Sequence, residues 1–347
     1  MNGELIFDGE DTTYKENDDA NNFNRYFVNS IKSIIDNIET NENENNYCTS
    51  DIWCENVLES FELIDSKKLR TIVFSLSNKM GTDEGISTDI LKKSYDLIEQ
   101  IFVDIINHSL KNGIFPDNWK TSTVIPIRKV NNTKKASEFR PVNKLPLYEK
   151  VLELIVKEQL NKYLGSNKVL SEEQSGFREK HSCETALQTV LNDWKIAIDA
   201  KKIIGVIFLD LKRAFEIVDR KILLNKLIKY GIKGIVLKWF KSYLNNRKQV
   251  VKYNNILSDE IEVEYGIAQG SVLGPILFIV YINDLVRYLK NIFGEECKTQ
   301  LFADDTLIYV EGDSEREIEF RIQRVFITAQ EWLNNNKLMM TVKKLNV

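Results

Sequence analysis

The stretch Leu-Phe-Ala-Asp-Asp-Thr-Leu-Ile-Tyr-Val at residues 301–310 decides how the rest of the chain is interpreted. Apolar residues lead up to a pair of acids and a β-rich run follows, which predicts strand, tight turn and strand with Asp304 and Asp305 at the tip. Neighbouring strand side chains point to opposite faces, so the two acids have different roles unless the turn re-aims one of them. Aspartate also suits turns for structural reasons, so the pair alone does not establish a site.

A second candidate carboxylate is Asp210, which ends the apolar run at residues 203–209. This run predicts a strand buried on both faces. Two carboxylates at strand ends can share hard cations, because Mg²⁺ prefers oxygen ligands and bridges carboxylates to substrate phosphates. Two such ions support in-line phosphoryl transfer without a protein base, which suits a chain with only His108 and His181. A helix N-cap is the structural alternative for Asp210.

Charge is unevenly distributed along the 347 residues. Residues 1–66 hold 3 Lys+Arg against 16 Asp+Glu, a net charge of −13, whereas the remainder holds 44 against 35, a net charge of +9. A basic body fits a polyanionic partner, although solvated surface lysines explain a modest excess equally well. We find neither a membrane-spanning apolar run nor a signal peptide, and the four scattered cysteines indicate reduced thiols in an intracellular protein rather than a zinc site.

Periodicity and capping residues predict the remaining elements. Residues 8–22 and 36–50 are acidic and Asn-rich, which favours disorder around a short amphipathic helix at 23–35. Pro126 favours an edge strand for residues 119–130. The other expected elements are helices at 66–77, 88–112, 147–164, 183–200, from 211 onward, within 221–244, at 275–285 and at 314–335, a β-pair at 249–253 and 260–265, and a final strand within 337–347.

Several motifs resemble those of reverse transcriptases from jockey-like non-LTR retrotransposons, in matching order across residues 70–347. The run at 205–219 is similar to motif A. Motif B resembles Ala-Gln-Gly-Ser-Val-Leu-Gly-Pro at 268–275 together with Tyr-Ile-Asn-Asp at 281–284. Motif C resembles Phe-Ala-Asp-Asp at 302–305. The finger motifs have counterparts in Phe-Arg-Pro-Val at 139–142 and Gln-Ser-Gly-Phe-Arg at 174–178.

This resemblance implies a role for each matching residue. Asp210 and Asp304 would hold two Mg²⁺ ions, for which Mn²⁺ can substitute, and Asp305 would complete the triad. Phe215 would exclude the ribonucleotide 2′-hydroxyl, with a core phenylalanine as the alternative. Gln269 and Gly270 would line the nucleotide pocket. Arg140 and Arg178 would bind the triphosphate, with surface cations as the alternative interpretation. Lys344 would act as the acid for the departing pyrophosphate.

The resemblance also implies an architecture. We expect an α/β (α+β) fold with right-hand polymerase fingers and palm, the palm being an antiparallel sheet packed on helices, and the thumb absent. The expected division is an acidic, partly disordered extension with a short helix at 1–66, a fingers-side region at 67–202 and a palm-side region at 203–347. Ala268 and Leu345 stand where relatives often carry Pro and Thr.

The function implied is RNA-directed DNA synthesis on an RNA template, from a DNA primer and deoxynucleoside triphosphates. Two alternatives remain at this stage. One is a truncated or domesticated fragment that binds nucleic acid without catalysis. The other is an RNA-templated RNA polymerase, against which Phe215 as a 2′-hydroxyl filter speaks.

Overall fold

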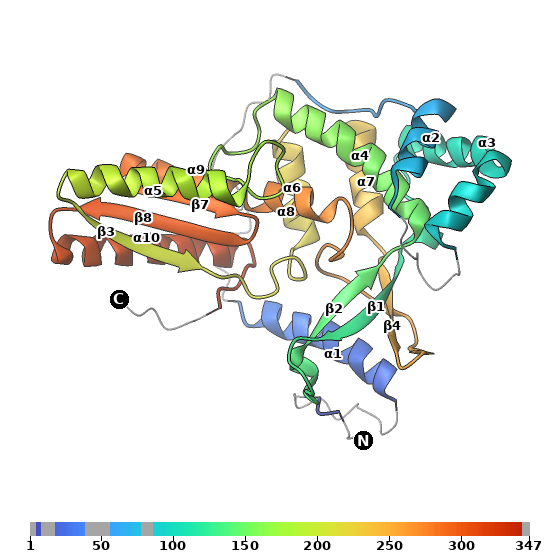
Figure 1. The fold of residues 1–347 in the computed structure, drawn as a ribbon, viewed down its shortest axis with the longest axis horizontal. Coiled ribbons are helices and arrows are strands. Elements are labelled where there is room, and N and C mark those ends of the chain that lie inside the picture. Colours follow the sequence, from blue (N-terminus) through green and yellow to red (C-terminus); the bar gives the residue numbers. More distant parts are fainter. Residues whose placement is uncertain (1–4, 8–17, 39–55, 78–85, 342–347) are drawn as a thin grey trace. The chain divides into compact units, whose positions relative to one another are not determined.

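The computed structural model describes residues 5–7, 18–38, 56–77 and 86–341. The chain forms two compact units, each assembled from separate segments: Met1–Asp36, Val57–Lys162 and Ile232–Gly274 in unit 1, and Asn37–Asn56, Tyr163–Gly231 and Pro275–Val347 in unit 2. The fold is mixed α/β with sheets packed on helices (Figure 1). The division at residues 66 and 202 inferred from the sequence does not coincide with these units and stays a prediction.

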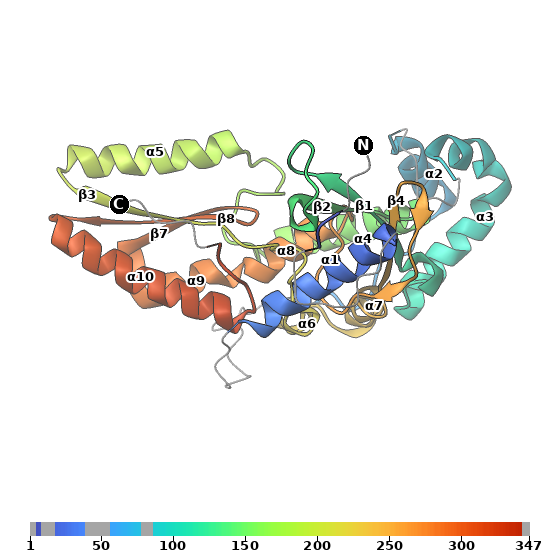
Figure 2. The ribbon, with the colours of Figure 1, turned by 90° about the horizontal axis from the view of Figure 1, so that it is seen from below.

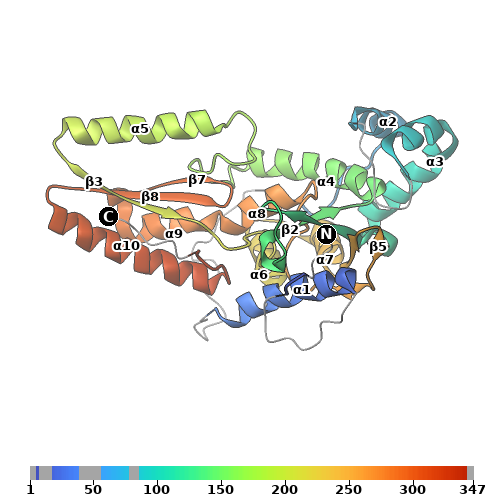
Figure 3. The same ribbon diagram turned by 60° about the horizontal axis from the view of Figure 1, so that its bottom comes forward.

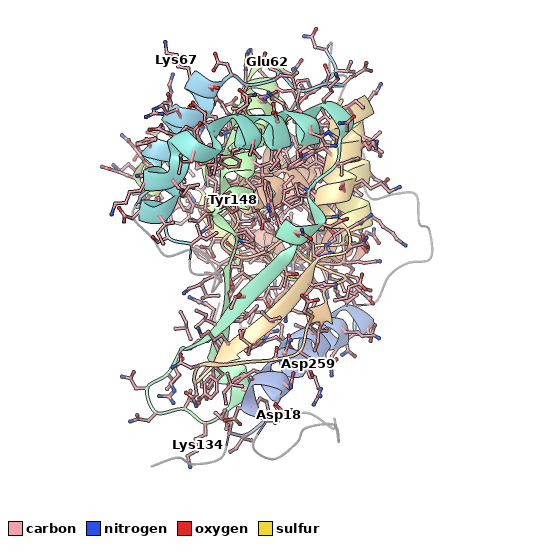
Figure 4. All side chains as sticks on the ribbon, turned by 90° about the vertical axis from the view of Figure 1, so that its right-hand side faces the viewer. Asp18, Glu62, Lys67, Lys134, Tyr148 and Asp259 are labelled. Atoms are coloured by element: carbon pink, nitrogen blue, oxygen red, sulfur yellow. The ribbon has the colours of Figure 1, made fainter. Side chains whose placement is uncertain are left out.

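Unit 1 is built on a small sheet with strand order β2-β1-β4-β5, to which β6 adds beside β4. Its strands are β1 (Thr121–Arg128), β2 (Phe139–Lys144), β4 (Lys248–Tyr253), β5 (Ile256–Leu257) and β6 (Ile261–Glu262). Its helices are α1 (Asp19–Asp36), α2 (Ser66–Ser75), α3 (Thr88–Asn112), α7 (Gly234–Leu244) and most of α4 (Leu147–Ser166), with short 3₁₀ turns at Asp117–Trp119 and Ala136–Glu138. Lys134 lies at the tip of the β1–β2 connection (Figure 4).

The N-terminal helix α1 is part of the core of unit 1. The centroid of the Phe23 ring lies 4.9 Å from the ring centroid of Phe139 of β2 and 5.0 Å from that of Tyr253 of β4. The buried Asn24 amide donates to Ser258 Oγ at 2.8 Å and accepts from the Gln249 amide at 2.8 Å. Helix α1 therefore starts before Phe23, at Asp19, so the predicted disorder of 8–22 is wrong for its last residues, while 8–17 and most of the 36–50 linker lie outside the described residues.

Strand β1 is central and not at the sheet edge, contrary to the expectation from Pro126. It pairs with β2 along most of its length and with β4 only through Thr121–Val124. Pro126 lies past the β4 ladder and faces Pro141 of β2. Antiparallel ladders alternate hydrogen-bonded pairs with pairs that exchange no hydrogen bond. Two facing prolines, which have no N–H to donate, fit a pair of the second kind without loss of a ladder bond.

Unit 2 contains an antiparallel sheet of order β3-β8-β7, formed by β3 (Ile203–Leu209), β7 (Cys297–Phe302) and β8 (Asp305–Gly312). Helix α5 (Cys183–Asp199) covers one face, and α9 (Asp284–Phe293) with α10 (Glu315–Asn335) covers the other (Figures 2 and 3). The remaining elements are α6 (Arg220–Lys229), the buried α8 (Gly274–Ile282) and a 3₁₀ turn at Gly294–Glu296.

Two expectations for this unit are wrong. Strand β3 is an edge strand whose Phe208 side chain is 72% exposed, so it is not buried on both faces. On the face toward α10 a Cβ on Gly205 would lie 2.6 Å from Ile318, whereas Phe208 points to the opposite face and stays exposed there. The chain after Leu211 makes turns, and helix α6 starts only at Arg220 with Asp219 as its N-cap.

The other predicted helices and the 301–310 hairpin are confirmed, including α3 with its Ser87 N-cap and left-handed Gly113 C-cap. Among the described residues, no helix has the length and apolar character to cross a membrane. Cys183 and Cys297 are free thiols, and Cys48 and Cys54 lie outside the described residues. Of the predicted final strand, residues 342–347 also lie outside them, and Met340 forms an isolated bridge with Leu211.

Candidate active site

The β7–β8 hairpin presents the two adjacent acids in different surroundings. The last paired residues are Phe302 and Asp305, which leaves Ala303 and Asp304 as the turn. Ala303 has a positive φ of 60°, a conformation that side-chain-bearing residues rarely adopt. Asp304 is half-buried in the turn, whereas Asp305 is exposed at the start of β8. The two adjacent acids therefore occupy different positions, Asp304 in the turn and Asp305 in the strand, which fits unequal roles.

Asp210 comes to the same end of the sheet. In the antiparallel β3–β8 ladder the last pair joins Leu209 to Thr306, so the next residue of β3 reaches the level of the hairpin acids. Burial raises the pKa of Asp304, and the negative charges of Asp305 and Asp210 raise it further, against a backbone hydrogen bond that lowers it. The Asp304 carboxylate therefore lies within electrostatic reach of both Asp305 and Asp210.

Such a set is suited to a hard cation, because carboxylate oxygens are the ligands that Mg²⁺ prefers and a cation relieves their repulsion. Within the described residues, however, no group of three or more His, Cys, Asp or Glu side chains could hold a metal ion alone. Mg²⁺ usually takes one or two carboxylates and completes its shell with water and substrate phosphate. The residues present fit that mode of binding rather than a closed protein cage.

Phe215 lies in the turns that follow Asp210. Its ring stacks on Phe278 of α8 with centroids 4.6 Å apart, and Phe177 meets it edge-on at 6.3 Å. Phe215 is half-buried and Phe177 is 53% exposed. The side chain is thus fixed from beneath by the core and still open to solvent, which combines the two readings made from the sequence. Its role as a sugar filter stays a prediction.

Arg178 has partners inside its own loop. Its guanidinium donates to the carbonyl of Ser171 and, at 3.0 Å, to that of Gln174. The predicted triphosphate contact remains a prediction, but the structure shows that this arginine also closes the 171–178 loop. Sequence reasoning missed this second role because loop closure by an arginine has no local signature.

Gln269, Gly270 and Arg140 belong to unit 1. Gly270 has a positive φ of 111°, and an added Cβ would lie 2.8 Å from the carbonyl oxygen of Asn143, so glycine is required there. The Asn143 N–H donates to the Gln269 carbonyl at 3.3 Å, and Arg140 is exposed on β2. Their nucleotide contacts stay predictions, and Lys344 lies outside the described residues.

A buried polar cluster in unit 1 supports the Gly270 loop, and no pattern in the sequence indicates it. Glu153 of α4 accepts from the Val272 N–H at 2.9 Å and from the Tyr243 hydroxyl at 2.5 Å. One helical turn earlier, Glu149 pairs with Arg247 at 2.8 Å. These acids belong to α4 and look like ordinary helix-surface residues in the sequence, so only the tertiary packing reveals their function.

Comparison with known proteins gives a consistent set of relatives. Residues 127–347 match the family described as reverse transcriptase (RNA-dependent DNA polymerase). The probable RNA-directed DNA polymerase from transposon X-element of Drosophila melanogaster is 28% identical over 70% of this chain and 26% of its own length. The RNA-directed DNA polymerase from mobile element jockey is 28% identical over 71% of this chain and 27% of its own in Drosophila melanogaster, and 30% identical over 66% and 25% in Drosophila funebris. The chain spans about a quarter of the length of these curated relatives.

Proposed function

Because the chain belongs to the reverse transcriptase family, we propose that it catalyses RNA-directed DNA synthesis, adding deoxynucleotides to a primer 3′-hydroxyl on an RNA template. The observation that carries this proposal is the meeting of Asp210 and Asp304 at one end of the β3–β8–β7 sheet. The relatives named as RNA-directed DNA polymerases support the choice of template and product. The net charge of +9 outside residues 1–66 suits a nucleic-acid partner.

Asp210 and Asp304 would hold two Mg²⁺ ions, and Asp305 would assist from the exposed side of the hairpin. When bound, such a pair of ions activates the attacking hydroxyl and stabilises the leaving oxygens of an in-line displacement. The protein's own part is positioning. Strand β3 and the hairpin hold the two carboxylates at one end of the sheet, and the negative charges of Asp305 and Asp210 around the half-buried Asp304 favour cation binding.

Phe215 would select the sugar. Its ring is backed by Phe278 at 4.6 Å, so it cannot retreat without disturbing the buried α8. A ring held in this way excludes an extra hydroxyl by contact, and a smaller side chain would admit it. This role makes deoxynucleotides, and not ribonucleotides, the expected substrates.

The test is primer extension on a homopolymer RNA template with Mg²⁺, using wild type, Asp210→Asn and Asp304→Asn. Asparagine keeps the side-chain size and removes the charge. Loss of several kcal/mol of transition-state stabilisation corresponds to roughly a 10³-fold lower rate. Asp313→Asn is the matched control, because Asp313 lies past the opposite end of the same strands and pairs with Lys202 at 2.5 Å.

The control variant should extend primers at the wild-type rate, and circular dichroism should show that all three variants are folded. Full activity in either Asp210→Asn or Asp304→Asn would refute the assignment of the metal ligands. Binding of primer–template without any extension by wild type would favour the non-catalytic alternative.

A further inference from the structure

The loop at residues 171–178 runs beside the catalytic hairpin. Its residues 173–175 continue the sheet as a short parallel bridge to β7. The Leu301 N–H donates to the Glu173 carbonyl at 2.9 Å, and the Ser175 N–H donates to the Leu301 carbonyl at 2.8 Å. Both bonds end at Leu301, two residues before the turn.

The side chain of Gln174 extends this pairing into the turn itself. Its Oε1 accepts from the N–H of Ala303 at 3.0 Å and from the N–H of Gly176 at 2.8 Å, and its Nε2 donates to the Ala303 carbonyl at 3.4 Å. Gln174 is 1% exposed. A primary amide has both a donor and an acceptor, so it can pair with both polar groups of one backbone residue as a neighbouring strand would.

Gly176 allows this close approach. A Cβ added there would lie 2.1 Å from the Ala303 nitrogen and 2.8 Å from its Cα. No side chain fits between the loop and the turn, so any substitution would push the hairpin away. Gln174 and Gly176 therefore both contact the backbone of Ala303, the first by hydrogen bonds and the second by close approach, which explains their spacing.

Ala303 needs such support. Its φ of 60° is unfavourable for a residue with a Cβ, by roughly 1–2 kcal/mol, and it directly precedes Asp304. If its peptide groups were released, the turn would relax and Asp304 would change direction. Bonds that fix both polar groups of Ala303 therefore fix the direction in which Asp304 leaves the turn.

We propose that Gln174 is a positioning residue that holds the catalytic turn, so that the Asp304 carboxylate stays beside Asp210 in a metal-binding arrangement. This inference rests on the proposed polymerase function. Arg178 acts as the second tie: by donating to the Ser171 and Gln174 carbonyls it fixes the loop from which Gln174 reaches the turn. Because Gln174 is 1% exposed, its effect should reach the metal site through the turn.

The test compares Gln174→Met with Gln300→Met. Methionine is close to glutamine in length and volume but cannot replace its hydrogen bonds. Gln300 donates to the Glu173 carbonyl at 2.9 Å and to Ser175 Oγ at 3.0 Å, so it fastens the same loop to β7 without touching the turn. The pair therefore separates holding the turn from holding the loop.

Three measurements are made on each variant: kcat and KM for the deoxynucleotide in primer extension, binding of Mn²⁺ to the nucleotide-free protein by electron paramagnetic resonance, and the thermal unfolding midpoint. A displacement of about 1 Å in a reacting group can lower the rate roughly 10²-fold. For Gln174→Met we expect a fall in kcat of about that size, KM within about twofold of wild type, and Mn²⁺ binding weakened about fivefold or more. For Gln300→Met we expect kcat and Mn²⁺ binding within about threefold of wild type at a similar unfolding midpoint.

Equal losses of kcat and Mn²⁺ affinity in the two variants, or wild-type values in Gln174→Met, would overturn the inference. Should Gln174→Met fail to fold, Gln174→Glu replaces it, since a carboxylate keeps both accepted bonds but puts a negatively charged oxygen against the Ala303 carbonyl in place of the donor, and the same comparison with Gln300→Met applies. If wild type does not extend primers, the polymerase proposal fails, whereas Mn²⁺ binding still decides whether Gln174 shapes the carboxylate site.

Discussion

The fully buried ion pair between Lys226 of α6 and Asp284 of α9 makes the stability of unit 2 sensitive to the loss of either charge alone. Lys226 Nζ lies 2.6 Å from Asp284 Oδ1 and also donates to the Tyr281 carbonyl at 2.6 Å, and both charged side chains are 0% exposed. The ammonium group lies 4.9 Å from the Tyr281 ring centroid and 4.6 Å from that of Trp332. The perturbations are Lys226→Met, Asp284→Leu and the double variant.

The structure sets the magnitudes. Removing one partner of a buried ion pair costs about 3–5 kcal/mol, because the other charge is left without compensation. Asp284 is the first residue of α9, where a helix N-terminus favours a negative charge by about 0.3–1 kcal/mol. Lys226→Met should therefore lower the free energy of unfolding by about 3 kcal/mol, the small end of that range. Asp284→Leu leaves the buried cation without a counter-charge and should lower the free energy of unfolding by about 5 kcal/mol.

The double variant removes both charges, and apolar replacement of a whole buried pair is often close to neutral. We therefore expect it to lose about 2 kcal/mol at most, far less than the sum of the single losses. Urea unfolding followed by tryptophan fluorescence measures this. With an m-value of about 2 kcal/mol/M, the single variants should lower the midpoint by roughly 1.5–2.5 M. Additive losses in the double variant would refute the argument, since they would mean that the two charges do not stabilise each other.

Three further predictions concern other positions. Gly270→Ala should lower kcat/KM in primer extension at least tenfold, because its Cβ would meet the Asn143 carbonyl at 2.8 Å in a left-handed backbone; unchanged kinetics would contradict this. Phe215→Ala should raise ribonucleotide incorporation relative to deoxynucleotide by about 10²-fold in single-nucleotide competition, and an unchanged ratio would end the gate interpretation. Burial, opposed by Arg247, raises the pKa of Glu149 from 4.5 to about 8, so the folded state binds this proton more tightly than the unfolded chain. Stability should therefore fall as the pH rises from about 4.5 to about 8, and Glu149→Gln should flatten that slope in thermal unfolding, whereas an unchanged slope would contradict the assignment.

Local patterns predicted elements well where a single element carries the signal. Helix α3 ends at the left-handed Gly113, as its residue type predicts, whereas residue type allows either Ser87 or Thr88 as the N-cap and the structure selects Ser87. Its buried side was less predictable. Leu97 and Ile101 are apolar residues of α3, yet they are 85% and 63% exposed. Periodicity shows where apolar residues lie on a helix, but not which of them another element covers.

The errors arose where neighbouring elements decide the outcome. Proline generally disfavours a central strand, yet the central strand β1 can contain Pro126 because its pairing with β4 stops at Val124. Strand β3 has an apolar sequence, yet Phe208 is exposed because α5, which covers that face, leaves this position uncovered. Sequence patterns describe one segment, whereas both outcomes depend on where a partner ends.

The sequence by itself determined the family, the two candidate metal ligands Asp210 and Asp304, and the hairpin that carries Asp304 and Asp305, because each depends on residue types in a fixed local order. Only the tertiary structure decided that Asp305, unlike Asp304, belongs to the strand, that Ala303 in the turn has a positive φ, and that Gln174, 129 residues earlier in the chain, hydrogen-bonds to that turn. The physical reason is that a buried hydrogen bond between distant segments depends on their packing, which no local pattern records.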